Sequence, residues 1–354
     1  MKKIVVSTFN NSKNNYGGVF QACALSKTLH DMHYDAKFIT LENRKIPQKT
    51  LLGKGKDIVR KIIKLPYKRK IKIKEESFQK FAKKTQNQLV FRDIRQLNEN
   101  PPIVDVYISG SDQVWNAVSF HEDLFLSYAP ENGKKISYAA SMGNERVPVQ
   151  NKEKFTHYIS RFDCISVRED TMVDLLKEYT DKSICQNIDP VFLMDKEDWL
   201  EWATPYKKLK FEKYILAYII EWNAEYNKKL KMIKKQTGLP VVFVNLGNLK
   251  RVSANQVIHD ASPNEFLGLL NGAEIIVATS FHGVAMSCVF NKPVMPMIGM
   301  DKPTRIQSLL RHFGLSCEEL LNNNGQGIDY QRVNAIIDDD KQKAKEYLYN
   351  AIEG

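Results

Sequence analysis

Residues 274–290, EIIVATSFHGVAMSCVF, contain an apolar run of strand length that leads directly into a second apolar stretch of helical character. Small polar residues, a histidine and a glycine occupy the junction between the two. A short apolar run bounded by polar or turn-forming residues is typical of a buried strand in a parallel sheet. The stretch therefore predicts a strand followed by a helix, which is the repeating unit of an α/β protein.

The same unit opens the chain. Lys2 to Thr8 predicts a short buried strand, residues 10–18 a loop rich in turn formers, Val19 to His33 a helix, and Asp35 to Leu41 a second strand. Three more strands that end in small or polar residues are predicted in IVDVYISGSDQVW (103–115), KISYAASMG (135–143) and CISVRED (164–170). Because ligands bind beyond the carboxyl ends of parallel strands, these ends predict a lined crevice.

The alternation of strand and helix starts again in the second half of the chain. Strands are predicted in YILAYII (214–220), PVVFVNL (240–246), AEIIVATS (273–280) and KPVMPMI (292–298). At 354 residues the chain is long for a single core. We therefore expect an N-terminal domain over residues 1–195 and a C-terminal domain over residues 196–354, with a basic helical excursion at about residues 50–90 and a last helix that packs back on the first domain.

Cysteine usage and hydropathy exclude several classes of protein. The five cysteines are dispersed without a Cys-x-x-Cys pair, which argues against a disulfide framework and against a zinc site. No apolar stretch reaches the roughly 18 residues that a membrane-spanning helix needs. The apolar run at the N-terminus is too short for a signal peptide. We expect a cytoplasmic protein without a metal.

Most of the net charge of +11 comes from one segment. Residues 52–84 contain thirteen Lys and Arg residues and three acidic residues. Such a segment could bind RNA, anionic lipid headgroups or an acidic partner, or it could be a solvated helical face. An RNA-binding strand motif is missing from the sequence, so we do not expect a nucleic acid as partner.

The junction at residues 279–283, TSFHG, has the composition of an anion site. Free N–H groups at a helix N-terminus favour an anion, Gly283 allows close approach, and Thr279 and Ser280 offer hydroxyl donors. His282 can donate an N–H or a proton near neutral pH. Two interpretations remain open at this stage: a phosphate or carboxylate pocket, or a histidine that only caps the helix.

Six stretches together resemble the polysaccharide pyruvyl transferase family, in the order of that family. They are NNYGGVFQACALSKTL (14–29), ISGSDQVWN (108–116), ISYAASMG (136–143), ISVRED (165–170), NIDPVFLMD (187–195) and TSFHGVAMSCVFNKPV (279–294). The resemblance implies a GT-B-like fold of two Rossmann-like domains that face a central cleft. It also implies transfer of the enolpyruvyl unit of phosphoenolpyruvate onto a sugar as a ketal, with release of phosphate and no further cofactor.

The resemblance also implies roles for single residues. His282 becomes the first choice for a general acid or a phosphate partner. Asp112 becomes a base or a ligand for sugar hydroxyls, unless it is only a turn residue or a helix cap. Arg168 matches a family arginine that would clamp the anionic donor, unless it only forms a salt bridge to Glu169 or Asp170. The expected donor-binding residues are Arg168, Thr279, Ser280, Gly283 and Arg305. The expected acceptor-binding residues are Asn15, Tyr16, Gly17, Ser111 and Gln113.

Many members of the family carry an arginine where this chain has Ser280, and Arg305 is the candidate to replace it. A nucleotide-sugar glycosyltransferase of the same fold is the main alternative enzyme, although residues 279–294 contain no glutamate for a ribose. A non-catalytic binding protein that acts through the basic segment is a third interpretation. The expected partners are phosphoenolpyruvate, a lipid-linked sugar acceptor and an anionic membrane surface, which would make the protein peripheral at the inner face of the membrane.

Overall fold

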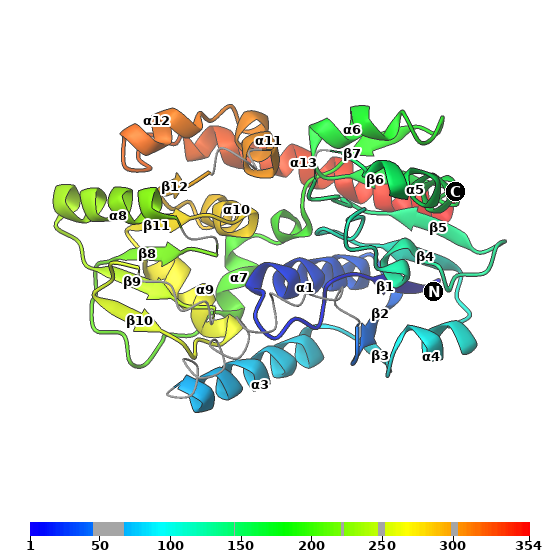
Figure 1. Ribbon diagram of the computed structural model, residues 1–354, viewed down its shortest axis with the longest axis horizontal. Helices are drawn as coiled ribbons and strands as arrows, with labels where there is room; N and C mark the ends of the chain where they lie inside the picture. Colours follow the sequence, from blue (N-terminus) through cyan, green and yellow to red (C-terminus); the bar gives the residue numbers. More distant parts are fainter. Residues whose placement is uncertain (45–66, 145, 221–222, 247–251, 299–303) are drawn as a thin grey trace.

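The computed structural model describes residues 1–44, 67–144, 146–220, 223–246, 252–298 and 304–354. Its two main sheets each contain five parallel strands, in the orders β3-β2-β1-β4-β5 and β10-β9-β8-β11-β12 (Figure 1). Both sheets are flanked by helices, so the predicted α/β class with parallel sheets is confirmed.

The first half of the chain forms the first sheet and a small parallel pair, β6 and β7, which extends it through a bridge between Ile136 and Cys164. The strands are β1 Lys3–Ser7, β2 Asp35–Leu41, β3 Gln88–Phe91, β4 Val106–Ser109, β5 Lys134–Ser137, β6 Ile165–Val167 and β7 Ile184–Gln186. The α-helices are α1 Tyr16–Asp31, α3 Lys68–Thr85, α4 Ile94–Glu99, α5 Lys152–Ser160 and α6 Asp170–Leu176. Short 3₁₀ helices are η2 Glu122–Phe125, η3 Val149–Asn151 and η4 Pro190–Leu193.

The second half forms the second sheet. Its strands are β8 Ile215–Tyr218, β9 Val241–Val244, β10 Gln256–Ile258, β11 Ile275–Ala278 and β12 Val294–Pro296. Its helices are α7 Lys196–Trp202, α8 Ala224–Thr237, α9 Pro263–Gly272, α10 Phe281–Val289, α11 Thr304–His312, α12 Cys317–Asn322 and α13 Tyr330–Glu353. The strands are short and their residues are mostly buried, as expected for strands covered by helices on both faces.

Helix α1 begins at Tyr16 rather than at the predicted Val19, because Asn15 caps it: the Asn15 side chain accepts a hydrogen bond from the Gly18 N–H over 3.1 Å. The earlier start brings Tyr16 into a core that joins both halves of the chain. The Tyr16 ring stacks on Phe266 of α9 with ring centroids 4.1 Å apart. Phe20, one turn later, contacts Trp199 of α7 edge to face.

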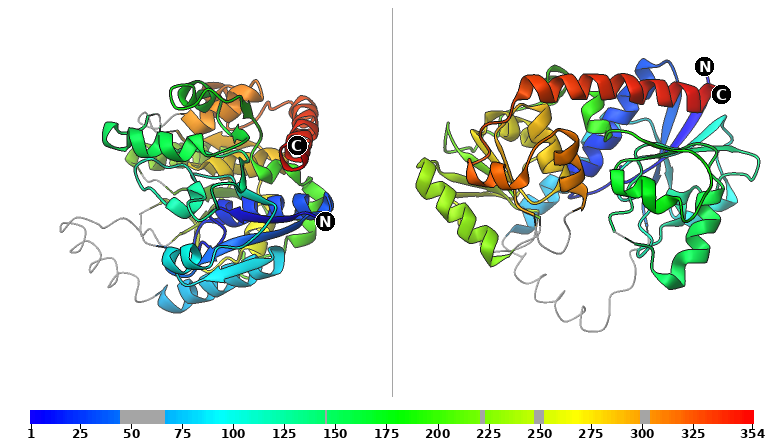
Figure 2. Two further views of the ribbon diagram at one scale, coloured as in Figure 1. Left: turned by 90° about the vertical axis from the view of Figure 1, so that its right-hand side faces the viewer. Right: turned by 90° about the horizontal axis from the view of Figure 1, so that it is seen from above.

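Helix α13 runs from the second half of the chain along the first, as Figure 2 shows. Tyr347 donates from its hydroxyl to the main-chain oxygen of Ser137 over 2.8 Å. Lys2 donates to the main-chain oxygen of Ile352 over 2.8 Å, and its ammonium group lies 3.1 Å from the Glu353 carboxylate. The two ends of the chain are therefore neighbours, and the last helix of the second half packs against the first half.

The strand order reverses between β1 and β4 in the first sheet and between β8 and β11 in the second. These two reversals are the places where ligands bind in open parallel sheets. Gly17 follows β1 and His282 follows β11, and the two residues lie in direct contact. The carboxyl ends of the two sheets therefore face each other, and their ligand-binding positions meet.

Candidate functional site

Asp189 lies between the two main sheets, where their carboxyl ends face each other. Its Oδ2 lies 2.7 Å from Arg168 Nη1, 3.3 Å from Ser111 Oγ and 3.4 Å from His282 Nε2. Its Oδ1 accepts the main-chain N–H of Val191 over 3.0 Å, which fixes the carboxylate at the start of η4. The Asp189 side chain is fully buried. One carboxylate thus joins residues from four separate stretches of the sequence.

Arg168 follows β6 and is equally enclosed. It donates from Nε to Glu169 Oε1 over 2.9 Å, and its guanidinium carbon lies 3.9 Å from the centre of the Phe281 ring. The salt bridge to Glu169 that the sequence left open is present, whereas Asp170 pairs with Arg311 over 2.8 Å. Arg168 Nη2 has no hydrogen-bond partner among the described residues.

The charges of this network depend on one another. Burial alone would raise the pKa of Asp189, but the positive charges of His282 and Arg168 hold it well below the ordinary carboxylate value. Burial alone would lower the pKa of Arg168, but the Glu169 and Asp189 carboxylates raise it. Asp189 is therefore ionised and Arg168 is protonated near neutral pH.

His282 lies in the first turn of α10 and does not cap it. Ser280 is the N-cap, because its side chain accepts the Gly283 N–H over 3.0 Å. The imidazole is about nine-tenths buried, with Nε2 3.4 Å from Asp189 Oδ2 and with the Nδ1 and Cγ side of the ring packed against Gly17. The interpretation of His282 as a helix cap is wrong, since Ser280 performs that function.

Three of the expected donor-binding residues are occupied by contacts within the protein. Thr279 Oγ1 accepts the Ile220 N–H over 2.9 Å, and Ser280 is used by the helix cap. A Cβ added to Gly283 would lie 2.7 Å from the Cβ of Ala278 and 2.9 Å from the ring of Tyr218. The glycine is required for close packing against the sheet.

The loop after β4 carries three of the residues expected on the acceptor side, Ser111, Asp112 and Gln113. Asp112 adopts a left-handed backbone conformation (φ 73°), which suits a turn and which Asp tolerates better than most residues. Its carboxylate lies 3.5 Å from Asn15 Nδ2, and Ser111 is held by the main-chain oxygen of Ala139 and by Asp189. The amide of Gln113, with its oxygen turned toward Arg305, accepts from Arg305 Nη2 over 3.0 Å. This contact crosses from the first half of the chain to α11.

Tyr16, expected on the acceptor side, is engaged within the protein. Its hydroxyl donates to the main-chain oxygen of Ala261 over 2.7 Å, and the side chain is buried in the core between the two halves. Burial and the neighbouring Tyr218 raise its pKa well above the ordinary value, so it is a neutral structural phenol. Asn15 and Gly17, on either side of it, remain at the meeting point of the two sheets.

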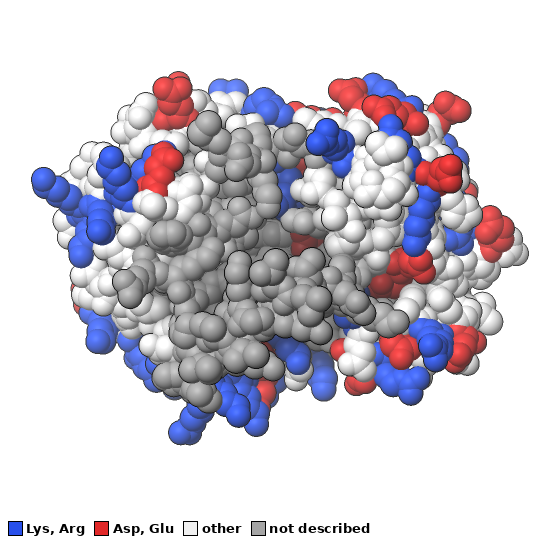
Figure 3. Space-filling view, in the orientation of Figure 1, with Lys and Arg blue, Asp and Glu red and all other residues white. Residues whose placement is uncertain are grey.

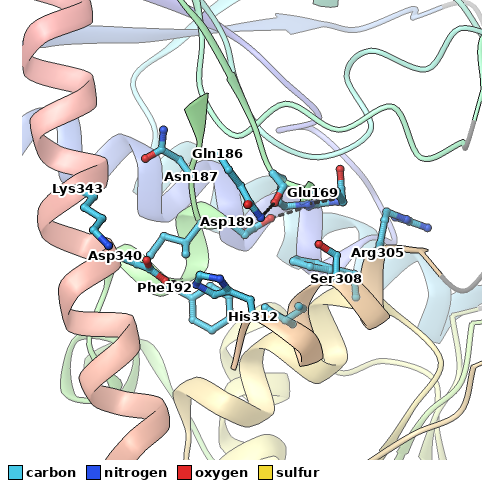
Figure 4. A pocket seen from close by; sticks show the side chains of 14 residues that line it. Glu169, Gln186, Asn187, Asp189, Phe192, Arg305, Ser308, His312, Asp340 and Lys343 are labelled. Atoms are coloured by element: carbon cyan, nitrogen blue, oxygen red, sulfur yellow. Dashed lines mark hydrogen bonds and ion pairs between the residues drawn. The ribbon is translucent and has the colours of Figure 1, made fainter. Parts of the chain in front are cut away.

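A cavity of about 200 Å³ lies beside the network (Figure 4). Arg168, Glu169 and Asp189 form one wall, and α11 and α13 form another with Arg305, Ser308, His312, Asp340 and Lys343. Phe281 also contributes to the lining. The cavity volume is several times the roughly 30 Å³ that one water molecule occupies. His282 is not among the described residues that line it, so Asp189 lies between the histidine and this cavity.

The sequence interpretation missed Asp189. The signal was present in NIDPVFLMD, where a lone carboxylate stands between the end of a short strand and an apolar run that must be buried. A buried carboxylate needs positively charged or N–H partners, so its position indicated a paired site.

In the described ranges no group of three or more His, Cys, Asp or Glu side chains is placed to hold a metal ion. No helix in the described part of the chain is long and apolar enough to cross a membrane.

Comparisons with known proteins concern the family and the fold of the chain. The model of a family described as polysaccharide pyruvyl transferase matches residues 15–299. No curated protein matched the chain. Among solved structures, UDP-N-acetylglucosamine 2-epimerase from Rickettsia bellii is 11% identical with a TM-score of 0.54, covering 100% of this chain and 97% of that chain. The same epimerase from Neisseria meningitidis, bound to UDP-GlcNAc, is 12% identical with a TM-score of 0.53, covering 99% of each chain.

Arabidopsis thaliana UGT89C1 in complex with quercetin is 9% identical with a TM-score of 0.54, covering 99% of each chain. At such identities the likeness concerns the fold alone. It confirms the expected GT-B-like architecture of two sheets that face each other.

Proposed function

The chain belongs to the polysaccharide pyruvyl transferase family, and from this premise we propose that it transfers the enolpyruvyl unit of phosphoenolpyruvate onto a sugar of a surface polysaccharide or of its lipid-linked precursor. The observation that carries the proposal is the Arg168–Asp189–His282 network. It joins three motifs of the family at the point where the ligand-binding edges of both sheets meet.

The proposed reaction balances as follows. The methylene carbon of the donor takes up a proton, one sugar hydroxyl oxygen bonds to the central carbon, and the bond from that carbon to the phosphate oxygen breaks. A second hydroxyl of the same sugar closes the ketal. Of the two hydroxyl protons released, one replaces the proton delivered to the methyl group and the other leaves with inorganic phosphate. The transfer therefore requires one acid and one base, and no redox step.

We assign the acid to His282 and the base to Asp112. His282 is the imidazole at the junction of both halves, and Asp112 stands on the side from which Asn15 and Gly17 approach. Arg305 borders the cavity and contacts Gln113 across the two halves, so it is our candidate for the cation that replaces the family arginine at Ser280. We place the acceptor on residues 1–195 and the donor against α10 and α11 of residues 196–354, with Arg168 Nη2 completing the donor site.

A nucleotide-sugar transferase is the alternative, since the structural neighbours include proteins with UDP ligands. The chain itself covers the carboxyl ends of β9 and β10, beside the reversal of strand order between β8 and β11. Lys74 of α3 donates to the main-chain oxygen of Asn245, directly after β9, over 3.3 Å. The Tyr67 ring stacks on His259, directly after β10, at 4.1 Å. This covering favours a donor smaller than a nucleotide sugar.

Phosphate release tests the proposal directly. Phosphoenolpyruvate is added with candidate glycan acceptors, and inorganic phosphate is followed together with the mass of the glycan, which should increase by one ketal-linked pyruvate. UDP-GlcNAc serves as the competing donor, and thermal shift compares the two ligands. Stabilisation by UDP-GlcNAc alone would favour the glycosyltransferase. Neither stabilisation nor phosphate release with a broad acceptor panel would favour a non-catalytic binding protein.

We further propose that the acceptor is reached at an anionic membrane surface through α3. The exposed face of this helix carries seven basic residues and one acidic residue, Glu76. The basic residues are Lys68, Arg69, Lys70, Lys72, Lys80, Lys83 and Lys84. Blue side chains gather along the lower edge of the molecule in Figure 3, over α3. Each basic residue near an anionic membrane contributes about 1 kcal/mol, so several give salt-sensitive docking.

Only part of the predicted basic segment can be assessed, because residues 45–66 lie outside the described residues. Within α3 the apolar side chains Phe78 and Phe81 pack into the core, and Tyr67 is engaged by His259. These aromatic side chains are therefore not available for insertion into a bilayer. The proposed docking rests on charge alone.

A further inference from the structure

Asp189 has more partners than charge neutralisation of Arg168 requires. Glu169 already supplies one carboxylate to the Arg168 guanidinium over 2.9 Å. Asp189 adds a second at 2.7 Å and, from the same oxygen, faces His282 Nε2 at 3.4 Å. Two buried carboxylates thus share Arg168, but only one of them faces the histidine.

The Asp189 carboxylate is held so that it can orient an imidazole. The Val191 N–H holds Oδ1, and Ser111 and Arg168 restrain Oδ2. An ionised carboxylate can only accept hydrogen bonds, so an imidazole nitrogen that faces it is favoured when it carries a proton. The Nδ1 and Cγ side of the same ring packs against Gly17 in the first turn of α1, away from Asp189.

We propose that Asp189 is a positioning residue that keeps the proton of His282 on Nε2, so that Nδ1 is the ring atom that exchanges a proton with the substrates. In this arrangement the general acid is the imidazolium, which gives its Nδ1 proton to the methylene carbon of the donor. The Nε2 proton stays on the ring throughout, on the side that faces the Asp189 carboxylate. The catalytic half of this inference rests on the proposed function, whereas the location of the proton does not.

The Asp189→Asn variant tests the inference, with Glu169→Gln as the matched control. Both remove one buried carboxylate from Arg168, but only the first changes what His282 faces. We expect kcat for phosphate release to fall on the order of 10²–10⁴-fold in Asp189→Asn, with a much smaller change in KM for phosphoenolpyruvate. Glu169→Gln should lose far less of kcat. Equal losses in the two variants would reduce Asp189 to a neutralising partner of Arg168 and overturn the proposal.

A measurement on the unmodified protein keeps the inference testable if Asp189→Asn fails to fold. Side-chain ¹⁵N NMR distinguishes a protonated Nε2 from a protonated Nδ1 in neutral histidine, and His282→Gln identifies the signal. We expect the neutral ring to carry its proton on Nε2. A proton on Nδ1 would overturn the inference even if phosphoenolpyruvate proved to be the donor. A proton on Nε2 in a protein that releases no phosphate would uphold the positioning and reject the proposed function.

Discussion

Gly17 and His282 are in such close contact that no other residue type fits at position 17 without movement. A Cβ built on Gly17 would lie 2.1 Å from His282 Nδ1 and 2.2 Å from its Cγ, far inside van der Waals distance. Gly17 belongs to the first turn of α1 and His282 to the first turn of α10. The contact therefore fixes how the two halves of the chain approach each other at the proposed active site.

Gly17→Ala should lower both stability and turnover, because the added methyl group must displace the His282 ring or separate the two helices. Overpacking of this kind typically costs about 1–3 kcal/mol. Urea denaturation measures the change in the free energy of unfolding. In a His282→Ala background the same substitution should cost much less, since the clashing ring is gone. An equal cost in both backgrounds would place the effect in α1 itself.

His282→Ala should retain the fold and lose most of its turnover. Ser280 caps α10 without the His282 side chain, so the helix keeps its start. Loss of a general acid costs on the order of 10² to 10⁴ in rate. Phosphate release is measured on protein whose circular dichroism spectrum matches the wild type. Near-wild-type turnover in that sample would remove His282 from the mechanism.

Arg168→Lys should weaken donor binding and also stability. A lysine ammonium cannot reproduce the planar contacts of the guanidinium with Glu169, Asp189 and the Phe281 ring. We expect KM for phosphoenolpyruvate to rise and the free energy of unfolding to fall by about 1–3 kcal/mol. If KM stays constant while only stability falls, Arg168 is a structural ion pair.

Asp189 should make the stability of the protein depend on acid pH. Its folded-state pKa lies below the ordinary carboxylate value, because the charges of His282 and Arg168 outweigh burial. Its contribution to stability is therefore complete above the unfolded-state pKa of about 4, and it is lost as the pH falls from there toward the folded-state pKa. Urea denaturation between neutral pH and pH 3 should show a flatter pH dependence for Asp189→Asn than for the wild type. Parallel curves would contradict the assigned charge state.

Charge reversal on α3 should abolish binding to anionic vesicles. Lys68, Arg69 and Lys70 are exposed, so their replacement by Glu should leave the fold unchanged. Co-sedimentation with phosphatidylserine vesicles at low salt should be lost in this variant, and in the wild type at high salt. A triple reversal of Lys228, Lys231 and Lys235 on α8 is the matched control, since these residues are also exposed. Equal loss in both variants would indicate a general charge effect and no docking role for α3.

Local features of the sequence determined the class of fold and the position of the histidine. Apolar runs of strand length alternate with helical stretches throughout. The spacing of apolar residues that distinguishes a strand from a helix depends only on residues close in the sequence. The small polar residues at the end of the strand in EIIVATSFHG likewise identified the junction, because a helix start is a local event that Ser280 completes within three residues.

Only the tertiary structure decided which side chains form the site. Asp189 meets Ser111 from 78 positions earlier in the chain and His282 from the second half, and these contacts depend on how the two sheets face each other. Tyr16 and Gly283, which the sequence assigned to ligands, are used instead for packing between and within the halves. The physical reason is that a polar or small residue beside a strand end serves a ligand or a neighbouring chain segment equally well. Whether such a residue binds a ligand or packs against the protein depends on which atoms the fold brings within a few ångströms of it.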